Sequence, residues 1–215
     1  MSTQSREAKM LRDILVVKSS LLYTDDTTWW FIPTEEEDFE HKAIKHYEYQ
    51  QRGKMEEDLA YQQPIPYVIV HNPELDKFVA YKRGNSKSTS WENRLYGKRR
   101  LGVWGHIEKA QEHEENPIRA TAKIEIEEEI WLSDIYDLEL LGYIRDKTVP
   151  VNLYHLGMVY VAKTNTPDIS VVDGELEEVY YMSREEIDGL MNSEDVQMES
   201  WSRIAWDAYV SCLSE

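Results

Sequence analysis

The sequence predicts a mixed α/β layered domain. Short segments rich in β-branched and aliphatic residues recur along the chain between turn-forming residues, and a few segments with helical spacing of apolar residues lie among them. The chain has 215 residues, 41% hydrophobic and 30% charged, which fits one generous domain or one domain with an extension. This mixture of short strands and helices is typical of a sheet packed against helices.

Residues 1–63 are expected to form an N-terminal extension packed on a core domain of residues 64–215. In the extension, residues 13–23 favour a strand or the start of a hairpin. A short strand over residues 29–32 is expected to stop at Pro33. Apolar residues at helical spacing predict a helix over residues 41–52.

The core domain is predicted to begin with a hairpin and to end with two helices. Its expected elements, in order, are strands at 66–71 and 77–81, a strand or turn at 101–107, a helix from Asn116, strands at 138–144, 153–162 and 177–182, a helix from Ser183 and a helix over 201–212. Ser183 and Glu186 form a capping-box pattern, which marks the start of the first of the two terminal helices. Asn116 and Pro117 likewise suit the N-cap and first position of the central helix.

Three carboxylates on this central helix are the strongest functional clue. Glu125, Glu128 and Glu129 are spaced i, i+3, i+4, so they share one helix face and repel one another. A narrow apolar stripe of isoleucine and alanine runs beside them, which predicts that they lie at the rim where the helix meets the body of the domain. Such a face suits a divalent cation, and the alternative is a solvated acidic helix surface.

Charge distribution excludes some classes of partner. The formal net charge of −17 argues against binding to a nucleic acid polymer or to an anionic membrane. Basic residues nevertheless gather between Lys77 and Arg100, so an anionic ligand could lie between this segment and the acidic helix; a solvated basic loop is the alternative. Cys212 is the single cysteine, and with no signal peptide or apolar span visible, we expect a cytoplasmic protein.

Residues 125–132 resemble the end of the Nudix hydrolase box, E-U-x-E-E-x-G-U with U aliphatic, and Gly102 and Gly105 resemble its glycine turn. Residues 63–67, 81–83, 92–95, 105–107 and 155–157 are similar, in the same order, to a bacterial subgroup of predicted phosphoesterases. The resemblance covers roughly residues 64–183. It implies a Nudix-type mixed β-sheet sandwiched between helices, with the N-terminal extension added.

The resemblance also implies hydrolysis of a diphosphate bond with Mg²⁺ or Mn²⁺. Glu128 and Glu129 would be metal ligands, Glu125 a ligand or the general base, and Gly105 part of the metal site. A later acidic residue would complete the site, with Glu175, Glu177 and Glu178 as candidates. Phosphate contacts are expected from a basic set composed of Lys82, Arg83, Arg94 and Arg100.

The chain departs from the family pattern at three positions. Ile124 stands where the box has arginine, Asn116 lies near the position of the glutamate that pairs with it, and Trp131 replaces the box glycine. In the family the arginine–glutamate pair fixes the loop and helix geometry. Loss of both partners together avoids an unpaired charge near the core.

Three functions follow from these patterns. The first is a metal-dependent hydrolase of a nucleoside diphosphate linked to another group, or of a related phosphoanhydride. The second is a nucleotide-binding or sensor module that has lost turnover. The third is an interaction protein that assembles through its extension and C-terminal helix; dimers are common in the family, which allows a homodimer.

Overall fold

The computed structural model describes residues 3–24, 30–83, 99–132, 134–170, 176–193, 196 and 198–213. Its strands are β1 (Asp13–Lys18), β2 (Phe31–Pro33), β3 (Glu48–Gln51), β4 (Tyr61–Asn72), β5 (Lys77–Arg83), β6 (Arg99–Arg100), β7 (Gly102–Trp104), β8 (Ile135–Ile144), β9 (His155–Thr164) and β10 (Leu176–Met182). Its α-helices are α1 (Thr3–Leu11), α2 (Ser19–Leu22), α3 (Phe39–His46), α4 (Arg52–Met55), α5 (Pro117–Ile130), α6 (Arg184–Asn192) and α7 (Ser200–Cys212).

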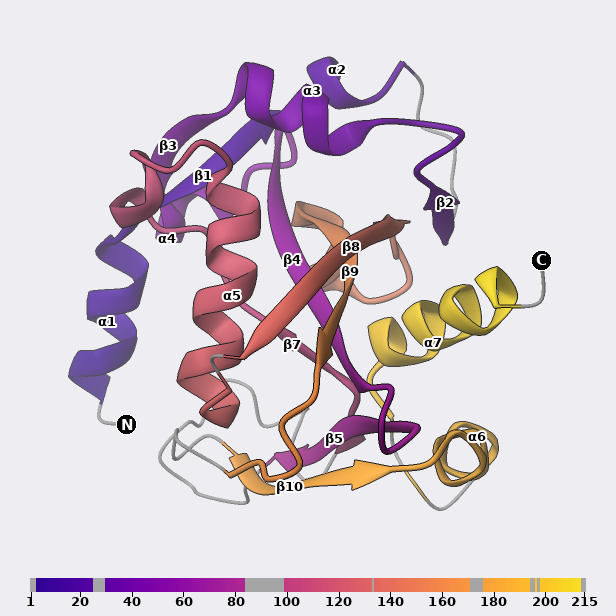
Figure 1. The fold of residues 1–215 in the computed structure, drawn as a ribbon. Coiled ribbons are helices and arrows are strands. Elements are labelled where there is room, and N and C mark those ends of the chain that lie inside the picture. Colours follow the sequence, from indigo (N-terminus) through magenta and orange to yellow (C-terminus); the bar gives the residue numbers. More distant parts are fainter. Residues whose placement is uncertain are drawn as a thin grey trace.

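A mixed sheet forms the centre of the molecule, with the strand order β10-β5-β4-β9-β8-β2 (Figure 1). The central pair, β4 and β9, is parallel, from Gln63 opposite His155 to His71 opposite Lys163. The neighbouring pairs are antiparallel. The short strand β6 pairs with β5, and the short strand β7 pairs with β4 and contacts the helix α5.

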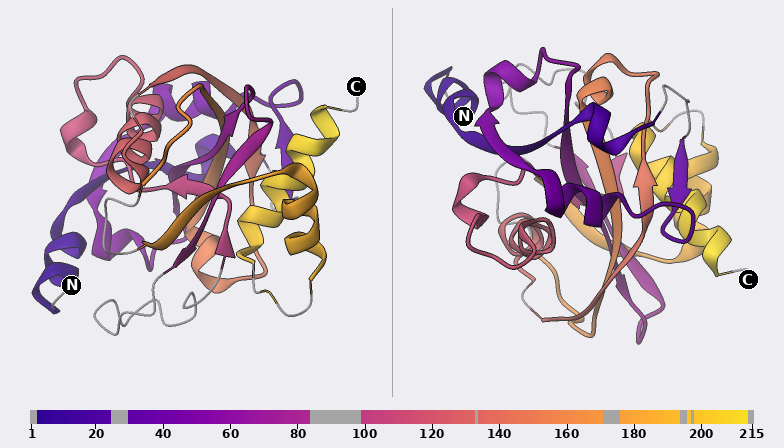
Figure 2. Two further views of the ribbon diagram at one scale, coloured as in Figure 1. Left: turned by 60° about the horizontal axis from the view of Figure 1, so that its bottom comes forward. Right: turned by 90° about the horizontal axis from the view of Figure 1, so that it is seen from above.

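Helices cover both faces of the sheet. Because side chains alternate along a strand, Val68 and Val70 of β4 face the core that contains α5, whereas Tyr67 and Ile69 face the core that contains α6 and α7. Seen from above, α5 and α7 lie on opposite sides of the sheet (Figure 2). The predicted α/β sandwich is therefore confirmed.

The first 60 residues are tied to the sheet by backbone pairing. Strand β2 pairs with β8, and β1 pairs with both β3 and the start of β4. The helix predicted over residues 41–52 was wrong in its second half: α3 ends at His46, and Glu48–Gln51 form β3 against β1. Tyr47 and Tyr49 pack edge to face there, as suits aromatic residues in strands.

The strand or hairpin start predicted over residues 13–23 was wrong in its second half: the pairing of β1 with β4 ends at Lys18, and Ser19–Leu22 form the helix α2. The remaining predicted elements formed close to the expected places. The hairpin of β4 and β5 turns at residues 73–76, and α5 starts at Pro117 with Asn116 as its N-cap. The capping box of Ser183 and Glu186 is present at the start of α6. Among the described residues, no helix is both long enough and apolar enough to cross a bilayer.

Candidate functional site

The helix α5 presents the three predicted carboxylates because its apolar stripe fixes its rotation. The side chains of Ile118, Ala122, Ile126 and Ile130 are fully buried against the sheet. Glu125 and Glu129, beside this stripe, are half-buried, while Glu128 is exposed. The acidic face therefore lies at the rim of the domain, as predicted.

The environment of Glu125 disfavours its charged form. Burial, followed by repulsion from Glu129 and Glu128, raises the pKa of the Glu125 carboxyl to about 8, although Arg100 opposes the shift. Glu108 adds a smaller repulsion of the same sign. Close carboxylates in a partly buried place form the kind of oxygen-rich site that a hard divalent cation stabilises.

Gly105 lies directly against this carboxylate. A Cβ atom at position 105 would overlap the carboxyl group of Glu125, so only glycine permits the observed approach. The loop that carries Gly105 is held from the N-terminal side, because Leu15 of β1 donates a backbone hydrogen bond to Ile107 at 2.8 Å. From the sequence, only the family resemblance placed Gly105 and Glu125 in one site. The structure shows that the two residues are in contact.

Glu129 has a cationic partner from outside α5. The Arg100 guanidinium donates to Glu129 Oε2 at 2.5 Å, and the Arg100 side chain is only 2% exposed. Arg100 is therefore buried beside the carboxylates, whereas the sequence had placed it with the residues that contact phosphate. Among the described residues, Glu108 and Arg100 act on Glu125 from outside α5, and the sequence did not indicate that either lies there.

The rest of the predicted basic set is only partly described. Lys82 is half-buried on β5, and the register places Glu178 of β10 opposite it. The side chains of Arg83 and Glu177, and all of Arg94 and Glu175, lie outside the described residues. Within the described ranges, no three acidic, histidine or cysteine side chains are gathered closely enough to enclose a metal ion.

The donor set nevertheless suits the hard divalent cation implied by the fold. All the candidate side-chain ligands on α5 are carboxylate oxygens, which Mg²⁺ and Mn²⁺ prefer. Because Gly105 has no Cβ, the Glu125 carboxylate lies directly against the main chain there. The residues present therefore fit such a cation.

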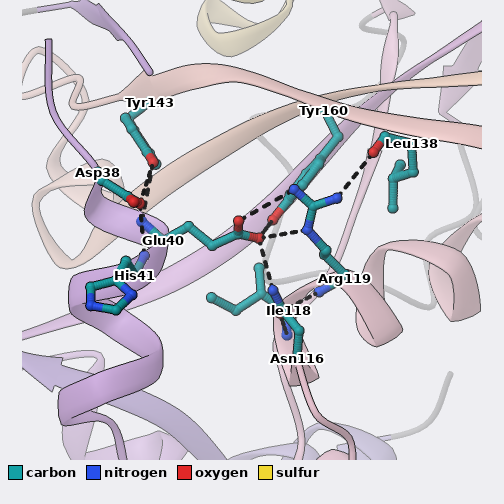
Figure 3. A network of polar contacts seen from close by, with 9 residues as sticks. All are labelled: Asp38, Glu40, His41, Asn116, Ile118, Arg119, Leu138, Tyr143 and Tyr160. Atoms are coloured by element: carbon teal, nitrogen blue, oxygen red, sulfur yellow. Dashed lines mark hydrogen bonds and ion pairs between the residues drawn. The ribbon is translucent and has the colours of Figure 1, made fainter. Parts of the chain in front are cut away.

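The amino end of α5 is anchored by a polar network (Figure 3). Glu40 of α3 accepts from Arg119 Nε and from Asn116 Nδ2, both at 3.1 Å, and from the hydroxyl of Tyr160. Arg119 also donates to the Leu138 carbonyl at 3.1 Å. Asn116 thus stands near the position of the missing box glutamate and links the helix start to the N-terminal segment.

A hollow of about 630 Å³ opens beside this network, lined in part by Asp38, Glu40, Arg119, Glu139 and Tyr143. Arg119 precedes Glu125 by six residues, or about 9 Å along the helix axis. The hollow therefore adjoins the amino end of α5 and not its carboxylate face.

Trp131 ends α5 in a conformation that favours glycine. Its φ of 48° and ψ of 47° are left-handed, and its amide donates to the Glu127 carbonyl at 3.1 Å. Glycine at the corresponding box position would adopt this geometry without strain. The indole is 73% exposed, so the tryptophan contributes little packing in exchange.

No protein-family model matches the chain. Protein YmaB of Bacillus subtilis (strain 168) is 30% identical to it over 170 residues, which cover 75% of this chain and 77% of YmaB. The structure of Tm1382, a candidate Nudix hydrolase, matches with a TM-score of 0.74 at 23% identity and covers 93% of this chain and 99% of Tm1382. A MutT/nudix family protein from Enterococcus faecalis matches with a TM-score of 0.52 at 12% identity, covering 72% of this chain and 63% of that protein. The chain therefore belongs to the same protein family as YmaB, and its fold is that of the Nudix hydrolases.

Proposed function

We propose that this protein is a divalent-cation-dependent hydrolase that cleaves phosphoanhydride bonds, with a nucleoside diphosphate linked to another group as its substrate. The observation that carries the proposal is the acidic face of α5 at the domain rim, with Glu125 seated against Gly105. The Nudix fold supports the reaction class, and the oxygen-only donor set supports the cation.

The proposed roles follow from the position of each side chain. Glu128 and Glu129 would hold Mg²⁺ or Mn²⁺, together with the main chain at Gly105. When bound, the cation would neutralise phosphate charge and lower the pKa of a coordinated water. Glu125 is a further ligand or the group that accepts a proton from the attacking water.

Substrate binding is assigned to the basic residues before the acidic helix. Lys82, Arg83 and Arg94 are the proposed phosphate contacts, since they belong to a basic segment in a strongly acidic chain. Arg83 and Arg94 can form bidentate contacts with phosphate, whereas Lys82 would act as a point charge.

A substrate screen tests the proposal. The purified protein is incubated with nucleoside diphosphates joined to sugars, to a second nucleoside or to other groups, and with nucleoside triphosphates, in the presence of Mg²⁺, Mn²⁺ or a chelator. We expect cation-dependent release of a nucleoside monophosphate or of phosphate, which the chelator and the E128Q substitution abolish. If no substrate is cleaved under any condition, the hydrolase proposal fails.

A nucleotide-binding module is the second candidate, because the chain lacks the arginine and glycine of the box. Isothermal titration with the same compounds separates the two. A compound that binds with micromolar affinity and is recovered intact after prolonged incubation with Mn²⁺ would favour the module. Turnover of a bound compound would exclude it.

A further inference from the structure

Arg100 is a buried cation at the edge of the proposed site. The residue is 1% exposed, and its guanidinium lies over the ring of Tyr81 at 4.6 Å and near that of Trp104 at 5.5 Å. Both rings offer the electron-rich face that stabilises a cation. The guanidinium is therefore enclosed by aromatic side chains and by Glu129.

The backbone that carries Arg100 is fixed on its carboxyl side. The Leu101 amide donates to Ser202 Oγ at 3.2 Å, and the Gly102 amide donates to the Tyr67 hydroxyl at 3.0 Å. The Tyr81 hydroxyl donates to the Gly102 carbonyl. Arg100 itself pairs with Tyr81 in the β5–β6 ladder, so its backbone is held on both sides.

A buried guanidinium requires an opposite charge, and Glu129 supplies it. A guanidinium stays protonated in proteins, so leaving this buried group without a nearby carboxylate would be strongly destabilising. The same ion pair fixes one oxygen of Glu129, while the Glu129 side chain remains 16% exposed. One edge of this carboxylate is thus held from the inside of the domain.

We infer that Arg100 is a positioning residue that orients the Glu129 carboxylate for a divalent cation and does not contact the substrate. The inference deepens the proposed function and rests on it. It reassigns Arg100 from the phosphate-binding set to the support of the metal ligands. Such second-layer partners typically change metal affinity or activity by about ten- to a hundredfold when removed.

A double-mutant cycle read by Mn²⁺ affinity tests this role without relying on turnover. Isothermal titration gives the Kd of Mn²⁺ for the full-length parent and for the variants E129Q, R100M and R100M/E129Q. We expect E129Q to weaken binding by about tenfold in the parent but by less than about threefold in R100M, because Glu129 is no longer oriented there. An equal factor in both backgrounds would overturn the positioning role while leaving the proposed function intact.

Two further variants control for misfolding of R100M and for the mere loss of an arginine. R100K keeps the positive charge and replaces R100M in the cycle if R100M does not fold. Because lysine lacks the planar guanidinium, the loss of Mn²⁺ affinity that E129Q causes in R100K should lie between the losses in the parent and in R100M. R99M changes the neighbouring arginine, which bonds the Tyr180 hydroxyl instead of a carboxylate, and should leave the E129Q factor at its parental value. An R99M result that matches R100M would contradict the specific role of Arg100.

Steady-state kinetics on the substrate found by the screen separates positioning from substrate contact. In R100M or R100K we expect kcat to fall by about tenfold or more with KM changed by less than about threefold. A KM raised by about tenfold with kcat unchanged would show that Arg100 grips the substrate and would overturn the inference. A parent that binds Mn²⁺ but cleaves nothing would refute the hydrolase, and the Mn²⁺ cycle would still decide the role of Arg100.

Discussion

At the scale of single residues, the acidic face depends on the close approach between Gly105 and Glu125. In G105A, the added methyl would overlap the Glu125 carboxyl, so the loop or the carboxylate must shift. Because the overlapped atoms are the tip of the flexible Glu125 side chain, we expect the free energy of unfolding to fall by only about 1 kcal/mol. Urea denaturation measures this, and Mn²⁺ titration should show weaker binding.

Gly189 provides the matched control for this substitution. It lies in α6, and a Cβ there would meet no atom within 4 Å. G189A should therefore stabilise the protein by about 0.5–1 kcal/mol, since alanine favours a helix interior more than glycine does. A loss of stability in G189A equal to that in G105A would refute the steric argument.

Trp131 is one of two non-glycine residues with a positive φ in the described part of the chain; the other is Asp76, in the turn between β4 and β5. A left-handed conformation costs a residue other than glycine about 1 kcal/mol, and the exposed indole returns little by packing. We expect W131G to increase the free energy of unfolding by about that amount, measured by urea denaturation. W131A keeps a Cβ and serves as the control; it should show no such gain.

His155 makes stability depend on pH. Burial, with a smaller effect from Arg52, lowers its pKa to about 4 in the folded protein. Its pKa in the unfolded chain is about 6.5, so the unfolded state binds more protons between these values and stability is lost as the pH falls below 6.5. At pH 5 the loss from this residue is about 2 kcal/mol relative to pH 7.

Thermal unfolding between pH 7 and pH 5 checks this expectation. H155Q should show a shallower decrease of Tm than the parent over this range. H113Q, which removes a histidine whose side chain is 87% exposed, should retain the parental slope. Equal slopes for H155Q and the parent would show that His155 does not titrate in this way.

At the scale of elements, the position of α5 depends on the N-terminal segment. Glu40 on α3 holds Arg119 and Asn116 at the first turn of α5 and accepts from Tyr160 on β9 (Figure 3). E40Q removes the charge from the centre of this network and should cost about 2 kcal/mol of stability. Urea denaturation provides the measurement.

Glu37, three residues before Glu40, offers the control. It pairs with Lys42 at 2.7 Å, but the side chains of Lys42 and Glu37 are 33% and 43% exposed, so water screens the pair and E37Q should cost less than about 0.5 kcal/mol. If E40Q cost no more than E37Q, the network would not anchor the helix.

The elements that the sequence predicted well are those with local signals. Asn116 and Pro117 mark the start of α5, and Ser183 and Glu186 mark the start of α6. Such caps can be recognised in the sequence because the residues that form them lie within four positions of one another. The strand β3 could not be predicted in this way. Residues 48–51 become a strand only because β1 is available as a partner, and the paired residues Asp13 and Gln51 are 38 positions apart.

At the scale of the whole molecule, the sequence predicted the layered α/β fold and the rim position of the acidic helix face. It could not show that Arg100 and Glu129 pair, since 29 positions separate them and the contact depends on how β6 meets α5. Nor could it show that Glu40 occupies the amino end of α5, 79 positions from Arg119. Local patterns in the sequence identified the acidic face, whereas the contacts of Arg100 and Glu40 that hold the helix and its carboxylates depend on long-range packing.

The central claim is that the acidic face of α5 makes the protein a cation-dependent hydrolase. The most direct test compares turnover in E128Q and E127Q, which remove one exposed carboxylate each from adjacent positions of the same helix. With Mn²⁺ and the substrate from the screen, we expect E128Q to lose about a hundredfold or more in kcat and E127Q to stay within about twofold of the parent. Equal activity in the two variants would contradict the account.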